Sequence, residues 1–140
     1  MKLIGLNFNK MSIERTSDSL ANAKISTNID VSEISKIKNT MFQGKEELIE
    51  VKFKYDVLYT PDIAKVELEG KVLFAVDLKA SKEILKKWEE KQIPEDFKMA
   101  VFNIIFRKAN IKALLMEDEL NLPPHLPFPT MAKGEKNQKD

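Results

Sequence analysis

Strict alternation of apolar and polar residues marks the middle of the chain as a pair of long strands. From Ile49 to Tyr59 every second residue is apolar or aromatic, and charged residues fill most positions between. After Thr60-Pro61-Asp62, a sequence typical of a turn, the alternation resumes from Ala64 to Val76. The pattern predicts a long antiparallel hairpin. Gly70 interrupts its second arm, where glycine usually marks a bulge or a close backbone approach.

Two further strands are predicted before this hairpin. Apolar residues alternate from Ile4 to Phe8 and again from Met11 to Ile13, so the phase changes around Asn9 and Lys10, which indicates a bulge or a break. Small polar residues from 16 to 22 predict a loop. From Lys24 to Ile37 the alternation returns and then loosens near Ser32, which predicts a strand with a ragged end.

The second half of the chain changes to the spacing of helices. Ser81 can serve as the N-cap of a short helix, and Pro94 suits the first turn of a longer helix that runs to about Met116. The apolar stripe of the longer helix is wide enough for burial on more than one side. It comprises Phe97, Val101, Phe102, Ile104, Ile105, Phe106, the Lys108 stem, Ile111, Leu114 and Leu115.

No further regular element is expected after this helix. Residues 117–119 (Glu-Asp-Glu) are expected to end it as a solvated acidic run, and LNLPPHLPFP, residues 120–129, is expected to be extended because of its prolines. Residues 130–140 have the composition of a disordered tail. The expected organisation is one α+β domain over residues 1–129.

Composition narrows the classes of function. The 23 basic residues nearly balance the 22 acidic ones without a strong single-sign patch, which argues against nucleic acid as a partner. The lack of cysteine removes disulfides and thiolate chemistry and favours a cytoplasmic location. Neither a signal peptide nor a run of eighteen apolar residues is present, so insertion into a membrane is not expected.

Groups for catalysis are scarce. His125, the single histidine, lies among prolines without neighbours at metal-ligand spacing, so a structural or exposed role is expected. The four glycines are scattered and form no phosphate-binding loop, so neither ATP nor another cofactor is expected. An enzyme would depend on isolated carboxylates such as Glu67 or Asp77. We therefore expect a binding protein rather than an enzyme.

Apolar and flexible side chains are abundant for so short a chain. It carries Trp88, eight phenylalanines and six methionines, and most of these are expected in the core. Methionine and flat aromatic side chains also suit surfaces that accept many apolar partners. The surplus of apolar side chains indicates an interface, either between subunits or with other polypeptides.

Three segments resemble the SecB family of protein-export chaperones. VELEGKVLFAV, residues 66–76, is similar to the family's third-to-fourth strand signature, NIIFRKA, residues 103–109, to the start of its long helix, and residues 120–128 to its following Asn-Leu-x-Pro segment. The order of the three agrees along nearly the whole chain. Arg107 stands where the family usually has proline, and the family's C-terminal helix and metal-binding tail have no counterpart.

The resemblance implies a four-stranded antiparallel sheet with two helices packed on one side, assembled as a homotetramer, a dimer of dimers. It also implies an ATP-independent holdase, with protein export as one setting, that binds unfolded polypeptides in apolar grooves between the long helix, the loop after the first strand and the sheet. The client-binding residues expected on this basis are Phe8, Met11, Ile13, Leu20, Trp88, Phe97 and Phe102.

A second hypothesis, from a different class of function, is also compatible with an apolar surface. The chain would then be a dedicated partner, such as an antitoxin-associated or assembly subunit, that binds one specific chain. Its docking element would be LNLPPHLPFP, because rigid proline-rich segments commonly dock on other proteins.

Overall fold

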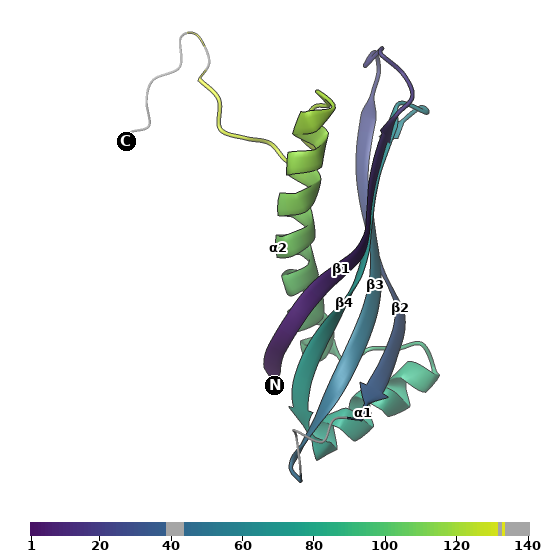
Figure 1. Cartoon of the computed structure of the whole chain (residues 1–140), viewed down its shortest axis with the longest axis vertical. Helices are drawn as coiled ribbons and strands as arrows, with labels where there is room; N and C mark the ends of the chain where they lie inside the picture. Colours follow the sequence, from purple (N-terminus) through teal and green to yellow (C-terminus); the bar gives the residue numbers. More distant parts are fainter. Residues whose placement is uncertain (39–43, 132, 134–140) are drawn as a thin grey trace.

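Four antiparallel strands form one sheet, and both helices lie on the same face of it in the computed structural model, which describes residues 1–38, 44–131 and 133 (Figure 1). The elements in order are β1 (Lys2–Arg15), β2 (Lys24–Ile37), β3 (Glu46–Thr60), β4 (Ala64–Asp77), α1 (Leu78–Glu89) and α2 (Glu95–Glu119). The strand order is β1-β4-β3-β2, so the predicted hairpin forms the centre of the sheet. The predicted α+β architecture is confirmed.

The register brings the apolar sides of all four strands to the face that the helices cover. One row across the sheet consists of Phe8, Gly70, Phe53 and Val31. The next row on the same face consists of Met11, Leu68, Tyr55 and Ile29. The opposite face is charged, with ion pairs such as Lys10–Glu67 and Lys71–Glu50 between neighbouring strands. The sheet therefore has one apolar and one charged side.

Both edge strands contain irregular pairing. In β1 the register shifts between Phe8 and Lys10, as predicted, and also between Leu3 and Gly5. In β2 the shift lies between Val31 and Glu33, after which the strand continues to Ile37. The expected ragged end of β2 is therefore wrong: the looser pattern reflects a bulge within a full-length strand.

Gly70 permits a close approach between β4 and β1. A Cβ atom at this position would clash with the carbonyl oxygen of Asn7 and would also lie 3.0 Å from the Cα of Phe8. This contact is next to the β1 bulge. The prediction of a close backbone approach at Gly70 is confirmed.

The first helix begins earlier than predicted. Asp77, the last residue of β4, is the N-cap of α1, and its Oδ1 accepts a hydrogen bond from the Ala80 backbone N–H at 2.7 Å. Ser81 is buried in the first turns, so its assignment as the N-cap was wrong. Strand and helix are directly joined, and aspartate caps as well as serine does. Pro94 immediately precedes α2, which extends three residues past Met116.

The buried side of α2 differs from the predicted stripe in its second half. The buried residues follow a four-residue step, and they are Phe97, Val101, Ile105, Ala109, Ala113 and Glu117. Each such step turns about 40° around the helix, so the buried line drifts away from Ile111 and Leu115, which are 56% and 60% exposed. Small alanines occupy the buried positions there. The expectation that these two residues belong to a buried stripe was wrong.

Candidate functional site

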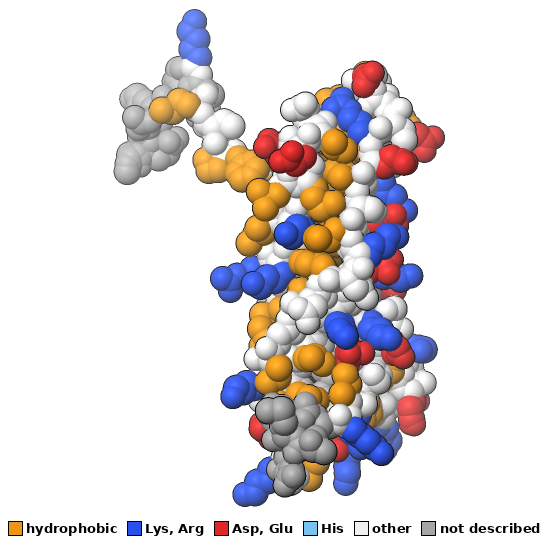
Figure 2. Space-filling model, viewed as in Figure 1, with side chains coloured by type: hydrophobic (Ala, Val, Ile, Leu, Met, Phe, Trp, Pro, Cys, Tyr) orange, Lys and Arg blue, Asp and Glu red, His pale blue; other side chains and the backbone are white. Residues whose placement is uncertain are grey.

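The apolar face of the sheet is wider than the helical layer above it. Helix α2 packs mainly on β4, and α1 packs across the ends of β2, β3 and β4. Edge strand β1 therefore keeps an uncovered apolar side, on which Met11 is 53% exposed. Figure 2 shows apolar side chains gathered between α2 and β1. We call this surface the β1 strip; it comprises Leu3, Leu6, Phe8, Met11 and Ile13.

A groove follows the other edge strand. Its first part has a volume of about 610 Å³ and is lined by residues of β2, by the α1–α2 connection and by Phe102 of α2. A second part of about 620 Å³ continues along α1 and shares Trp88 and Lys91 with the first. We call the whole the β2 groove; its apolar lining is Ile29, Val31, Ile34, Leu85, Trp88, Ile93 and Phe102.

The structure separates the seven residues expected to bind clients. Phe8, Met11 and Ile13 lie in the β1 strip, and Phe8 packs edge-on against Phe53 with ring centroids 6.0 Å apart. Trp88 and Phe102 lie in the β2 groove. Leu20 is an exposed residue of the loop that follows β1. The predicted residues thus supply two apolar surfaces rather than one site.

Phe97 does not belong to either surface. It is only 4% exposed, and its ring packs edge-on against Phe74 of β4 with centroids 5.4 Å apart. It also lines a separate pocket of about 330 Å³ together with residues of α1, outside the β1 strip and the β2 groove. Phe97 is therefore mainly a core residue, and its role in client binding stays a prediction.

Several lining residues of the β2 groove were not predicted. The alternation in the second strand placed Ile29 and Val31 on one face, but it gave no reason to select them over other strand residues. Lys91 and Lys98 have no local signal, because a lysine in a charged run normally contacts solvent. Lys91 of the α1–α2 connection and Lys98 in the first turn of α2 are part of the groove only because the fold brings them beside β2.

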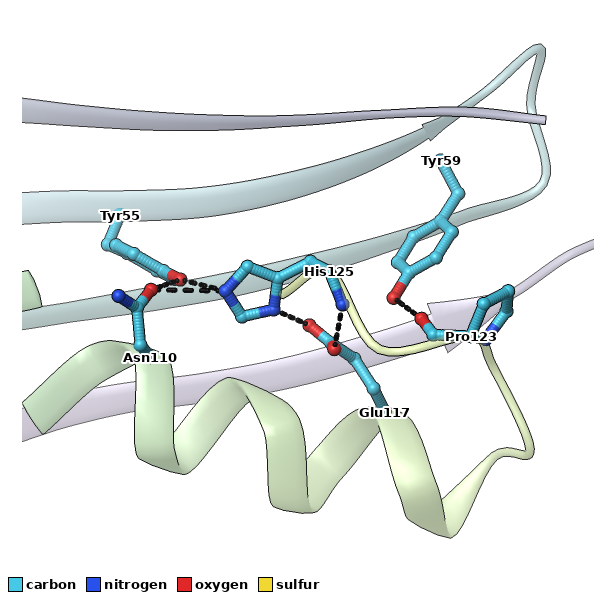
Figure 3. Close-up of polar contacts among 6 residues, drawn as sticks. All are labelled: Tyr55, Tyr59, Asn110, Glu117, Pro123 and His125. Carbon is cyan, nitrogen blue, oxygen red and sulfur yellow. Dashed lines mark hydrogen bonds and ion pairs between the residues drawn. The ribbon is translucent and has the colours of Figure 1, made fainter. Parts of the chain in front are cut away.

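The C-terminal segment crosses back over α2 and is held by a buried polar network (Figure 3). His125 Nδ1 lies 2.7 Å from Glu117 Oε2, and the His125 backbone N–H donates to Glu117 Oε1 at 2.9 Å. His125 Nε2 lies 3.0 Å from both Tyr55 Oη and Asn110 Oδ1. Both the His125 and Glu117 side chains are fully buried. The structural role expected for His125 is confirmed, whereas a solvated Glu117 was wrong.

Other hydrogen bonds fix the same segment. Tyr59 donates its hydroxyl to the carbonyl oxygen of Pro123 at 2.5 Å. Arg15 Nη1 donates to the carbonyl oxygens of Leu120 and Asn121 at 2.9 and 3.1 Å. The first half of LNLPPHLPFP is therefore part of the fold and is not free to dock elsewhere. The exposed residues of the segment are Asn121 and Pro124 in the first half and, in the second half, Leu126 and Phe128 among others.

Burial in this network changes the acidity of the two tyrosines. Desolvation, together with the nearby negative charge of Glu117, raises the pKa of Tyr55 and of Tyr59 well above the usual value of about 10. Both hydroxyls are therefore held protonated as hydrogen-bond donors. The network is enclosed by the fold, so its role is structural: it holds the C-terminal segment in place.

Two other properties of the described residues bear on function. Among them, no three histidine, cysteine, aspartate or glutamate side chains are grouped closely enough to hold a metal ion. None of their helices has the length and apolar character needed to cross a membrane.

Comparison with known proteins shows a similarity of fold. No family model matches the sequence, and no curated protein matches it either. Among solved structures, the chain is similar to the Mycobacterium tuberculosis SecB-like chaperone Rv1957, solved in complex with a ChAD peptide from the Rv1956 HigA1 antitoxin. The TM-score is 0.54 at 10% identity, and the match covers 96% of this chain and 92% of the other. The protein therefore has the SecB-like fold that its sequence motifs predicted.

Proposed function

We propose that the protein is an ATP-independent holdase that captures unfolded segments through the β1 strip and the β2 groove. The observation that carries this proposal is the width of the apolar sheet face, which extends beyond both helices and leaves Met11 and the lining of the β2 groove open. Such a surface costs stability unless something covers it. The setting is cytosolic, with protein export as one use.

The strength of capture follows from the size of these surfaces. Burying one Met or Phe side chain that is now exposed contributes about 1.5–3 kcal/mol before the client's ordering cost is subtracted. One surface therefore binds a flexible segment weakly. A homotetramer arranged as a dimer of dimers would present each surface four times, and a long client engaged at several of them gains affinity by effective concentration.

The alternative proposal is a partner protein that binds one specific chain. It is favoured by the solved structure of similar fold, which holds a peptide from an antitoxin. The same two surfaces would then recognise a defined segment rather than many unfolded ones. The proline-rich segment contributes little here, because its first half is internal.

Suppression of aggregation tests the proposal. A chemically unfolded model protein is diluted without nucleotide in the presence of the chain, and light scattering is followed. The double variant Met11→Ser/Phe102→Ser changes one residue of each surface and should abolish suppression. The control Met99→Ser/Ile111→Ser changes two residues exposed on the outer side of α2, whereas Phe102 is partly buried, and the control should retain suppression. Circular dichroism confirms that both variants are folded.

The outcomes separate the two proposals. Equal suppression by both variants would refute the two surfaces as the binding site. If the folded wild-type chain suppresses no aggregation at any ratio but binds one chain at fixed stoichiometry, the holdase is refuted and the dedicated partner stands.

A further inference from the structure

We propose that the β2 groove selects extended segments in which acidic residues accompany apolar ones, over segments of equal apolar content with basic residues. The inference rests on the proposed function, since it specifies which polypeptides the groove accepts. It follows from the placement of lysine side chains in the groove.

Two lysines lie directly over the aromatic rings of the groove. The Nζ of Lys91 is 4.6 Å from the centroid of the Trp88 ring, and the Nζ of Lys98 is 5.6 Å from the centroid of the Phe102 ring. Both distances are within the range of cation–π interactions. Each ammonium is thereby held beside an apolar surface that a client side chain would contact. A client carboxylate next to an apolar anchor would meet a cation already in position.

The remaining charges of the groove reinforce this arrangement. Lys82 and Lys86 line its second part, and the carboxylates among the lining residues are Asp30 and Glu89, so four lysines face two acids. The whole chain, by contrast, has a net charge of only +1. The groove is therefore more basic than the protein to which it belongs.

The groove lysines also differ from the lysines of the sheet in their partners. Five of the eight lysines on the strands form ion pairs within 4.0 Å of a carboxylate; they are Lys10, Lys36, Lys52, Lys65 and Lys71. Within the described part of the chain, none of the four groove lysines has such a pair. The Lys82 charge does act on the nearby Glu47 carboxylate, so the charges most available for a ligand are those of Lys86, Lys91 and Lys98.

Helix capping does not account for the lysine at position 91. Lys91 follows the C-cap Glu90 of α1 and has a φ of 58°, a left-handed conformation in which glycine or asparagine is preferred. A lysine here is a poor choice for ending a helix. The cation–π contact between the Lys91 ammonium and the Trp88 ring accounts for a lysine at this position, whereas the backbone conformation does not.

The size of the expected selectivity follows from the electrostatics of partly exposed groups. Each new ion pair in such a place contributes modestly, and each lysine on a basic client would meet a like charge instead. Summed over the groove, the Kd for an acidic segment should be about tenfold lower than the Kd for a basic segment at low salt. Added salt should reduce it, because exposed charges are screened within about 10 Å at 0.1 M ionic strength.

Two labelled peptides test the inference. They share the same apolar residues, contain no tryptophan, and carry either four glutamates or four lysines at the intervening positions. Fluorescence anisotropy gives the Kd at low and high salt, and the fluorescence of Trp88, the only tryptophan, reports whether a peptide occupies the groove. We expect the acidic peptide to bind about tenfold more tightly, with the advantage falling at high salt.

Charge reversal locates the effect. The variant Lys91→Glu/Lys98→Glu should bind the basic peptide more tightly than the acidic one, and Lys98→Glu alone should reduce the preference if the double variant folds poorly. The matched control Lys2→Glu/Lys79→Glu makes the same change in net charge outside the groove and should keep the acidic preference.

The possible failures are distinguishable. Equal affinity for both peptides, or a preference for the basic one, would overturn charge selection and leave the proposed function intact. A control variant that loses the preference as fully as the groove variant would show that net charge alone is responsible, and would also overturn it. If neither peptide binds and no aggregation is suppressed, the proposed function fails together with the inference.

Discussion

Replacing His125 by alanine should destabilise the protein more than its position near the end of the chain suggests. The ring is fully buried and lies 2.7 Å from the buried Glu117 carboxylate. Removing the ring leaves the buried Glu117 carboxyl group without its Nδ1 partner, and an unsatisfied buried polar group costs about 1–3 kcal/mol. One hydrogen bond to Glu117, from the backbone N–H of residue 125, can persist in the variant. Tyr55 and Asn110 lose their contacts with Nε2 as well, so we expect a loss at the upper end, about 3 kcal/mol.

Urea denaturation at fixed protein concentration measures this loss, with Trp88 fluorescence and circular dichroism as independent probes. The melting temperature should fall by roughly 10 °C for a chain of this size. The double variant Glu117→Leu/His125→Leu removes both the carboxyl group and the ring but leaves the residue 125 backbone N–H without its acceptor, so it should recover only part of the stability. A loss below about 1 kcal/mol for His125→Ala would refute the reasoning, since the segment would then be only loosely attached to the fold.

Three further predictions follow from contacts described above. Gly70→Ala should cost at least about 1–3 kcal/mol in urea denaturation, because its Cβ would clash with the Asn7 carbonyl oxygen; a neutral effect would show that β1 shifts freely. Asp77→Ala should cost about 1 kcal/mol by removing the N-cap of α1, and Asp77→Asn should restore most of it. The raised pKa values of Tyr55 and Tyr59 mean that the unfolded chain loses these protons first. The stability that the two protonated hydroxyls contribute is therefore fully present below a pH of about 10. It falls as the pH rises above that value. The double variant Tyr55→Phe/Tyr59→Phe should show a shallower alkaline loss in melting experiments, and an unchanged slope would contradict the assignment.

The central strands and the β1 bulge could be predicted because their signals are local. A period of two over more than ten residues fixes which side chains share a face, and a change of phase at Asn9 requires an extra residue in the pairing. Gly70 was recognisable for a similar reason, since a glycine within an otherwise regular strand requires an explanation.

The second half of α2 could not be predicted from hydrophobicity. Ala109 and Ala113 are buried and Ile111 is exposed, because the buried line is set by how the helix crosses the strands rather than by which side chains are most apolar. Glu117 was misjudged for the same reason. Its burial depends on a histidine eight residues later that folds back over it. The β2 groove likewise depends on tertiary contacts, so only Trp88 and Phe102 could be singled out beforehand.

The irregular pairing of β1 and β2 has a consequence for a protein that keeps apolar side chains uncovered. The central pair β3–β4 runs in continuous register, whereas the strands at the two margins of the sheet carry all the register shifts described in it. A flat, regular edge strand is a template on which strands of other chains can pair and assemble into fibres. A β-bulge distorts the edge and so disfavours this pairing. Under the proposed function, the protein would hold unfolded chains against its side chains, while its own backbone would be a poor template for amyloid-like growth.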